Sequence, residues 1–149
     1  MTPGDQVYLP MCLDYIHIGH INILNHALAT GATRITIGLV TDELMDQYKK
    51  RHHTYSQRWE LAYALKGVTN ITKEGTQPLF IDTIMKLQPE YVIHGDDWSK
   101  KEAPLFHIRN MVRRIVRQYG GIVIEPPYTE GVNSTKIRDE YSYNAGNGL

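Results

Sequence analysis

"RITIGLV", residues 34–40, is rich in β-branched side chains and almost continuously apolar, as expected of a strand buried on both faces of a parallel sheet. Upstream of it, apolar residues recur at helical spacing over residues 19–28, and the "TGAT" segment that follows stops this helix. Further upstream, "QVYLP", residues 6–10, has the composition of a short strand, and we expect Pro10 to end it. Residues 6–40 therefore predict one strand–helix–strand unit.

The rest of the chain repeats this alternation. Further strands are expected at "VTNIT" (68–72), "EYVIHG" (90–95) and "IVIEPPY" (122–128). Further helices are expected within "TDELMDQY" (41–48), "TYSQRWELAYAL" (54–65), "PLFIDTIMKL" (78–87), "APLFHIRNMVRRIVRQYGG" (103–121) and "TEGVNSTKIRDEY" (129–141). This order predicts an α/β fold, a Rossmann-like doubly wound parallel sheet of five strands with helices on both faces. No linker or repeat interrupts the pattern, so residues 1–149 are expected to form a single domain.

The charge and cysteine content exclude several classes of partner. Sixteen lysines and arginines balance sixteen aspartates and glutamates, so no overall field attracts nucleic acid or an anionic membrane. Cys12 is the only cysteine, which excludes an internal disulfide framework and a thiolate zinc site and fits a cytoplasmic location. We expect neither a signal peptide nor a membrane-spanning segment. Any bound anion must therefore be met by a local cluster of donors.

The unusual residues of the chain all follow predicted strands. They are residues 11–20 after the first strand, Thr41 after the second, "HGDDW" (94–98) after the fourth and "YTEGVNST" (128–135) after the fifth. In open parallel sheets, ligands bind outside the carboxyl ends of the strands, where the strand order reverses. This shared position predicts a ligand-binding crevice.

His17 and His20 stand at the predicted start of a helix, with Gly19 between them. A glycine keeps bulk away from the helix start, so a phosphate could approach its backbone N–H groups and receive a ring N–H from each histidine. By itself, the H-x-G-H pattern equally fits a helix cap beside a core histidine, or a metal site.

A second group of donors stands near the end of the chain. Gly131 permits a turn, and Asn133, Ser134 and Thr135 follow it where a helix is expected to start. Their hydroxyl and amide groups could hold phosphates. The alternative is an ordinary N-cap, because these are preferred capping residues.

"KKRHH", residues 49–53, is expected to be a basic loop. Lys49 or Lys50 could close over phosphates, or the segment could be only a solvated charge run. Arg58, just inside the next helix, could point into the crevice or form a surface ion pair.

Acidic residues also fall in the predicted crevice. Asp96 and Asp97 could hold a metal, accept from a base or cap a helix, and Trp98 could cover a base or the core. Asp14 could help to hold Mg²⁺ or act as a turn residue. The sequence contains no P-loop, dinucleotide-binding fingerprint or hydrolase nucleophile elbow.

Taken in order, these residues resemble the cytidylyltransferase-type nucleotidyltransferase family. The resemblance rests on "DYIHIGH" (14–20), "GLVTDE" (38–43), "YSQR" (55–58), "VIHGDDW" (92–98) and "YTEGVNSTKI" (128–137). Each motif is weak alone, but their common order is specific. Class I aminoacyl-tRNA synthetases share the H-I-G-H signature, but this chain has no room for their further domains and no clear K-M-S-K-S motif.

The resemblance implies attack by a phosphate-type oxygen on the α-phosphorus of CTP, with Mg²⁺ or another divalent cation and release of pyrophosphate. It implies catalytic roles for His17, His20, Lys49 and Arg58, and binding of Mg²⁺ by Asp14. It implies nucleotide contacts for Met11, Cys12, Gly19, Asp96, Asp97, Trp98, Thr129, Gly131, Ser134 and Thr135, and acceptor contacts for Tyr128, Glu130 and Asn133. Homodimers are common in the family, so a homodimer is expected.

Two positions depart from the glycerol-3-phosphate and choline-phosphate branches, which carry R-T-E-G-I-S-T-T or a close relative. Tyr128 stands at the arginine position and Asn133 at the first serine position. The segments 120–127 and 7–24 are instead similar to phosphonate cytidylyltransferases, which occur alone or fused to phosphoenolpyruvate mutase domains. We therefore expect a small phosphonate acceptor, 2-hydroxyethylphosphonate before 2-aminoethylphosphonate, in phosphonate biosynthesis. The alternatives are glycerol 3-phosphate or phosphocholine as acceptor, a bifunctional chain cut short, and a nucleotide-sensing module without turnover.

Overall fold

A computed structural model describes residues 6–127, and these form a five-stranded sheet in the order β3-β2-β1-β4-β5. All neighbouring strands are parallel, which confirms the predicted sheet. The strands are β1 (Gln6–Met11), β2 (Arg34–Val40), β3 (Asn70–Glu74), β4 (Tyr91–Ile93) and β5 (Ile122–Ile124). The chain runs outward from β1 to β3 and then crosses back to β4, so the strand order reverses between β1 and β4.

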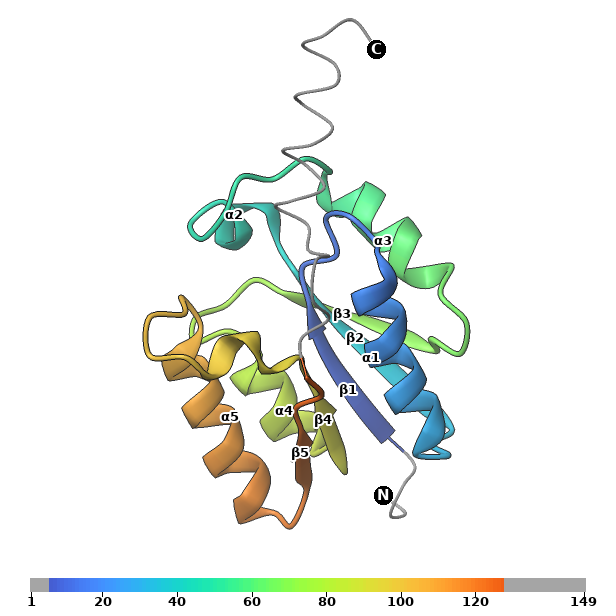
Figure 1. The fold of residues 1–149 in the computed structure, drawn as a ribbon, viewed down its shortest axis with the longest axis vertical. Helices are drawn as coiled ribbons and strands as arrows, with labels where there is room; N and C mark the ends of the chain where they lie inside the picture. Colours follow the sequence, from blue (N-terminus) through green and yellow to red (C-terminus); the bar gives the residue numbers. More distant parts are fainter. Residues whose placement is uncertain (1–5, 128–149) are drawn as a thin grey trace, which may run out of the picture.

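Helices cover both sides of the sheet (Figure 1). The helices α1 (Ile18–Ala29) and α3 (Tyr55–Tyr63) lie on one side, and α4 (Ile81–Leu87) and α5 (Phe106–Gln118) on the other. Two short elements, α2 (Asp42–Met45) and the 3₁₀ helix η1 (Asp96–Ser99), follow the carboxyl ends of β2 and β4. In the part of the chain that the structure describes, none of the helices has the length and apolarity needed to cross a bilayer.

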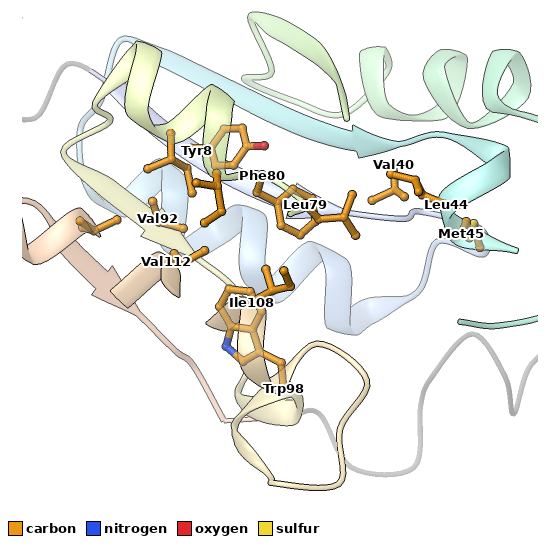
Figure 2. Close-up of a cluster of buried hydrophobic side chains, with 13 residues drawn as sticks. Tyr8, Val40, Leu44, Met45, Leu79, Phe80, Val92, Trp98, Ile108 and Val112 are labelled. Carbon is orange, nitrogen blue, oxygen red and sulfur yellow. The ribbon is translucent and has the colours of Figure 1, made fainter. Parts of the chain in front are cut away.

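The alternation of side chains along β1 divides the core in two. Val7 and Leu9 face α1 and α3, whereas Tyr8 faces α4 and α5 and packs in the cluster that contains Trp98 and Val112 (Figure 2). Because both faces of the central strands are covered, a nearly continuous apolar run such as β2 is required there. The fold class therefore follows from the buried strands, as the sequence predicts.

Local signals set several helix boundaries. Thr54 caps α3 and forms the expected capping box with Gln57, whose side chain accepts from the Thr54 N–H at 2.9 Å. Thr41, rather than Asp42, caps α2. The expected helix and turn over residues 129–141, with the end of the fifth predicted strand at Tyr128, lie outside the described residues.

The prediction that Pro10 ends the first strand is wrong. Pro10 does not end β1 but lies inside it, in register with Gly38. β4 pairs with β1 only at Val7 and Tyr8, so Pro10 has a paired neighbour on one side only, a position where the missing N–H is tolerated. The helix expected within residues 78–87 is α4, which begins at Ile81, after Phe80 in the left-handed conformation at φ 70°.

Gly38 is required where the ring of Tyr8 crosses β2. A Cβ built on Gly38 would collide with the hydroxyl oxygen of Tyr8. That hydroxyl is held in place because it donates to the buried carboxylate of Glu74 at 2.6 Å. We expect Gly38→Ala to lower the free energy of unfolding by about 1–3 kcal/mol, the usual cost of overpacking a core. Urea denaturation measures this loss, and a variant as stable as the parent would contradict it.

Candidate functional site

A cavity of about 790 Å³ opens at the carboxyl ends of the strands, where β1 and β4 diverge. Its walls come from the β1–α1 loop, the flank of α1, the loop after α2, the start of α4 and the segments after β4 and β5. The predicted site residues that line it are Met11, Cys12, Asp14, His17, Gly19, His20, Lys49, Asp97 and Trp98. The sequence thus places the crevice correctly, although not every predicted residue reaches it.

The two histidines cap α1 and also line the cavity. Nδ1 of His17 accepts from the N–H of Gly19 at 3.0 Å, and Nδ1 of His20 accepts from the N–H of His17 at 3.1 Å. A backbone N–H can only donate, so neither Nδ1 carries a proton. Each neutral ring therefore carries its proton on Nε2. The cap and the phosphate-donor interpretations of H-x-G-H are thus compatible, because they use different ring nitrogens.

Burial keeps both rings neutral. It lowers the pKa of His17. The pKa of His20 is lowered to about 3, mainly by burial and further by its proximity to His17 and to the positive charge of Lys49. The two rings lie 4.1 Å apart between centroids, so protonating one would disfavour protonating the other. At neutral pH both rings are therefore neutral, and each offers one Nε2–H donor.

Gly19 leaves room at the helix start, as predicted for approach of an anion, but its own N–H is not available to that anion. It lines the cavity, but its N–H is already donated to His17. An anion at this helix start would therefore meet the ring N–H groups rather than the N–H of Gly19.

Of the two candidate lysines, Lys49 lines the cavity and Lys50 does not. The ammonium of Lys49 is close enough to lower the pKa of both His20 and His94. This places one positive charge beside the two histidine donors, as a phosphate-binding lysine requires.

The adjacent lysines give a matched test of this placement. We expect Lys49→Ala to lower kcat/KM for nucleotide turnover by about 10- to 100-fold, the worth of one charge-assisted hydrogen bond to phosphate. Lys50→Ala removes the same charge from the same exposed loop and should change kcat/KM by less than about threefold. Equal losses in both variants would contradict a direct role for Lys49.

Arg58 lies neither in the cavity nor on the surface, so the predicted direct catalytic contact is wrong. It is fully buried, and its guanidinium donates to the carbonyls of Cys12 and Val40 at 2.8 Å each and to Asp42 Oδ1 at 2.8 Å. These partners stand at the ends of β1 and β2 and at the start of α2. Arg58 therefore holds together the strand ends from which the site is built.

Asp14 does not fit the predicted role of metal ligand. Its side chain is 1% exposed, and its two carboxylate oxygens accept from the backbone N–H groups of His52 and His53. The described residues contain no group of three or more histidine, cysteine, aspartate or glutamate side chains that could hold a metal ion. A Mg²⁺ ion bound mainly by substrate phosphates and water needs no such group, so Mg²⁺ stays a prediction as part of the nucleotide substrate.

The acidic segment after β4 separates into different positions. Asp97 lines the cavity with its side chain 54% exposed, whereas Asp96 is not among the lining residues. Trp98 is 2% exposed, and its indole N–H donates to Glu125 at 2.7 Å. Of the two alternatives for Trp98, the structure supports packing in the core over an exposed platform for a base.

His94 is a cavity residue that the sequence-based prediction omits. Its ring stacks on Trp98 at 3.8 Å between centroids, and its Nδ1–H donates to the carbonyl of Gly95 at 2.8 Å. Burial lowers its pKa, so Nε2 is an unprotonated acceptor. The signal that could have found it is its position directly after a predicted strand, in the same motif as Asp97.

The remaining predicted site residues lie outside the described residues. They are Tyr128, Thr129, Glu130, Gly131, Asn133, Ser134 and Thr135. The last described residues before them, Pro126 and Pro127, line the cavity.

The family model for cytidylyltransferase-like proteins matches residues 9–140. The chain belongs to the cytidylyltransferase-like family. The match begins in β1 and includes the histidine motif and the region beyond Pro127.

The chain is also similar to named cytidylyltransferases. The chain is 29% identical over 128 residues to glycerol-3-phosphate cytidylyltransferase of Bacillus spizizenii, an alignment that covers 85% of this chain and 89% of that protein. It is 33% identical over 97 residues to ethanolamine-phosphate cytidylyltransferase of Arabidopsis thaliana, over 62% of this chain but only 23% of that longer protein. Membership of this family and these relatives support a nucleotidyltransferase of the cytidylyltransferase kind.

A solved structure confirms the fold. The lipopolysaccharide core biosynthesis protein from Thermoplasma volcanium superimposes with a TM-score of 0.62 over 84% of this chain and 96% of that one. Its sequence identity is 17%, so this likeness concerns the Rossmann-like fold alone.

Proposed function

We propose that this protein transfers CMP from MgCTP to a small phosphonate, with release of pyrophosphate. The observation that carries the proposal is the pair His17 and His20, fixed as neutral Nε2–H donors in one cavity with Lys49. Phosphoryl-type transfer needs positioning and charge neutralisation more than covalent chemistry from the protein. These three side chains supply both.

In the proposed reaction, an oxygen of the acceptor phosphonate attacks the α-phosphorus of CTP. The new P–O bond forms as the bond from the α-phosphorus to the bridging oxygen of the β-phosphate breaks, and that oxygen leaves with its electron pair as pyrophosphate. Negative charge grows on the leaving group, where the ring N–H groups of His17 and His20 would stabilise it. Lys49 would neutralise the α-phosphate and the approaching acceptor. The dication enters with the triphosphate.

The preference for cytosine is proposed on the family and on Asp97. Cytosine presents an amino donor where uracil presents a carbonyl acceptor, and a half-exposed carboxylate such as Asp97 can accept from it. A site built around that donor leaves groups unpaired with the wrong base. We expect kcat/KM with CTP to exceed that with UTP or ATP by about a hundredfold or more.

The preference for a phosphonate rests on the departures at Tyr128 and Asn133. An ammonium group on the acceptor would need a carboxylate or an aromatic cage, and Asp14 is engaged by backbone N–H groups. A hydroxyl group needs only neutral partners. We therefore place 2-hydroxyethylphosphonate first. A second candidate acceptor is glycerol 3-phosphate, favoured by the relative that bears its name and aligns over 89% of its length.

The test is a screen of four nucleoside triphosphates against a panel of acceptors, read by pyrophosphate release. The panel holds 2-hydroxyethylphosphonate, 2-aminoethylphosphonate, glycerol 3-phosphate, ethanolamine phosphate and phosphocholine. The expected result is the highest kcat/KM with CTP and 2-hydroxyethylphosphonate. A clear preference for glycerol 3-phosphate would replace the acceptor but keep the reaction. Binding of CTP with no pyrophosphate release from any acceptor would favour a nucleotide-sensing module instead.

A further inference from the structure

Asp14 joins two loops that lie 38 positions apart in the sequence. It belongs to the loop between β1 and α1, three residues before His17. Its Oδ1 accepts from the N–H of His53 at 2.8 Å and its Oδ2 from the N–H of His52 at 2.9 Å. Hydrogen bonds from N–H groups to a carboxylate are about twice as strong as neutral ones. A nearly inaccessible carboxylate thus fastens the loop after α2.

Further contacts join the same two loops beside the carboxylate of Asp14. The ring Nδ1–H of His53 donates to the backbone carbonyl of Asp14 at 2.6 Å. The ring of Tyr15 stacks on His52 at 4.9 Å and meets His53 edge-on at 5.4 Å between centroids. Two successive residues of one loop therefore pack against two successive residues of the other.

The fastened loop carries Lys49, three residues before His52. The loop is also held by Arg51, which pairs with Asp46 at 3.0 Å and with Asp42 at 3.4 Å, and the N–H of Lys49 donates to the carbonyl of Met45 at 3.1 Å. Asp46 is half exposed, and exposed ion pairs contribute little because solvent screens them. The Met45 contact holds Lys49 to the end of α2, and the buried contact at Asp14 joins the loop directly to the segment that carries His17 and His20.

We propose that Asp14 is a positioning residue, which fixes Lys49 relative to His17 and His20 so that all three meet the same triphosphate. This inference rests on the function proposed above and replaces the role of metal ligand for Asp14. Because Asp14 lies on the segment that carries the histidines, one residue sets the spacing between both groups of donors. A displacement of about 1 Å at such a group can cost on the order of a hundredfold in rate.

A double-mutant cycle tests the proposal. We expect Asp14→Asn, which keeps the shape but replaces one acceptor oxygen by an N–H₂ group, to lower kcat/KM by about 10- to 100-fold. In a Lys49→Ala background, the same change should cost less than about threefold, because its target is already gone. Asp46→Asn, which weakens the exposed pair on the same loop, is the control and should change kcat/KM by less than about threefold. Independent, multiplicative losses would overturn the proposal.

Two further readouts distinguish the positioning of Lys49 from the binding of a metal by Asp14. A metal ligand would shift the Mg²⁺ concentration for half-maximal rate, so a large shift in Asp14→Asn would overturn the positioning role. Trypsin should cut after Lys49, Lys50 or Arg51 faster in Asp14→Asn than in Asp46→Asn, and equal rates would also overturn it. Trypsin cleavage needs no substrate, so it remains decisive for the fastening if no acceptor supports turnover. If Asp14→Asn does not fold, His53→Ala loosens the same contact from the other loop and replaces it in the cycle.

Discussion

Alanine at His17 or His20 should lower kcat by about two to three orders of magnitude, the loss expected when one preorganised donor is removed from a developing charge. The reason is that both rings are already fixed by hydrogen bonds in the protein without nucleotide. Nδ1 of each ring already accepts from a backbone N–H, at 3.0 Å for His17 and 3.1 Å for His20, so each Nε2–H is set before nucleotide binds. Such donors cost no reorganisation in the transition state. The expected effect therefore falls mainly on kcat rather than on KM.

His17 permits a control that separates capping from catalysis. Its ring caps α1 through the N–H of Gly19, and asparagine is also a preferred capping residue. His17→Asn should keep the stability of the parent within a few tenths of a kcal/mol, whereas His17→Ala should lose about 1 kcal/mol. Both should lose kcat alike. If His17→Asn retains near-normal kcat, the ring serves the helix only, and the assignment of His17 as a phosphate donor fails.

The parts of the fold that the sequence predicts are those set by neighbouring residues. β2 coincides with the predicted residues 34–40, because an apolar β-branched run has few other places in an α/β domain. The start of α3 is predicted because Thr54 and Gln57 satisfy each other locally. The start of α4 is not, because the left-handed conformation of Phe80 has no signal in its residue type.

The residues of the candidate site likewise divide into those that could be predicted from neighbouring sequence and those that could not. His17, His20 and Lys49 line the cavity, and their position could be predicted because they follow the carboxyl ends of β1 and β2 in the sequence. The structural roles of Asp14 and Arg58 are not visible in the sequence because their partners are remote: His52 and His53 for the one, Cys12 and Val40 for the other. A charged residue close to functional residues in sequence is easily taken for one of them. Its burial and its hydrogen bonds show which parts of the site it holds together.

Replacement of Arg58 by methionine should cost about 3–5 kcal/mol of the free energy of unfolding, as is usual when one partner of a buried ion pair is removed. The change removes the donor to the carbonyls of Cys12 and Val40 and one of the donors to the carboxylate of Asp42. A domain of this size has about 5–15 kcal/mol in total, so Arg58→Met should lose a large part of its stability. Its melting temperature should fall by on the order of 10 °C.

Urea denaturation of Arg58→Met and Arg58→Lys at several pH values measures this prediction. Lysine keeps the charge but cannot reach several acceptors in a planar fork, so it should recover only part of the loss.

Burial acts to raise the pKa of Asp42, but the hydrogen bond from Arg58 and the other favourable contacts outweigh it and lower that pKa. The stabilisation from a carboxyl group with a lowered pKa is present above its ordinary range and lost as the pH falls through the lowered value. The gap between parent and Arg58→Met should therefore narrow in acid. A loss below about 1 kcal/mol would show that water can replace the guanidinium and that Arg58 does not hold the strand ends together. A large gap that does not change with pH would show that the carbonyls of Cys12 and Val40, rather than Asp42, account for the loss.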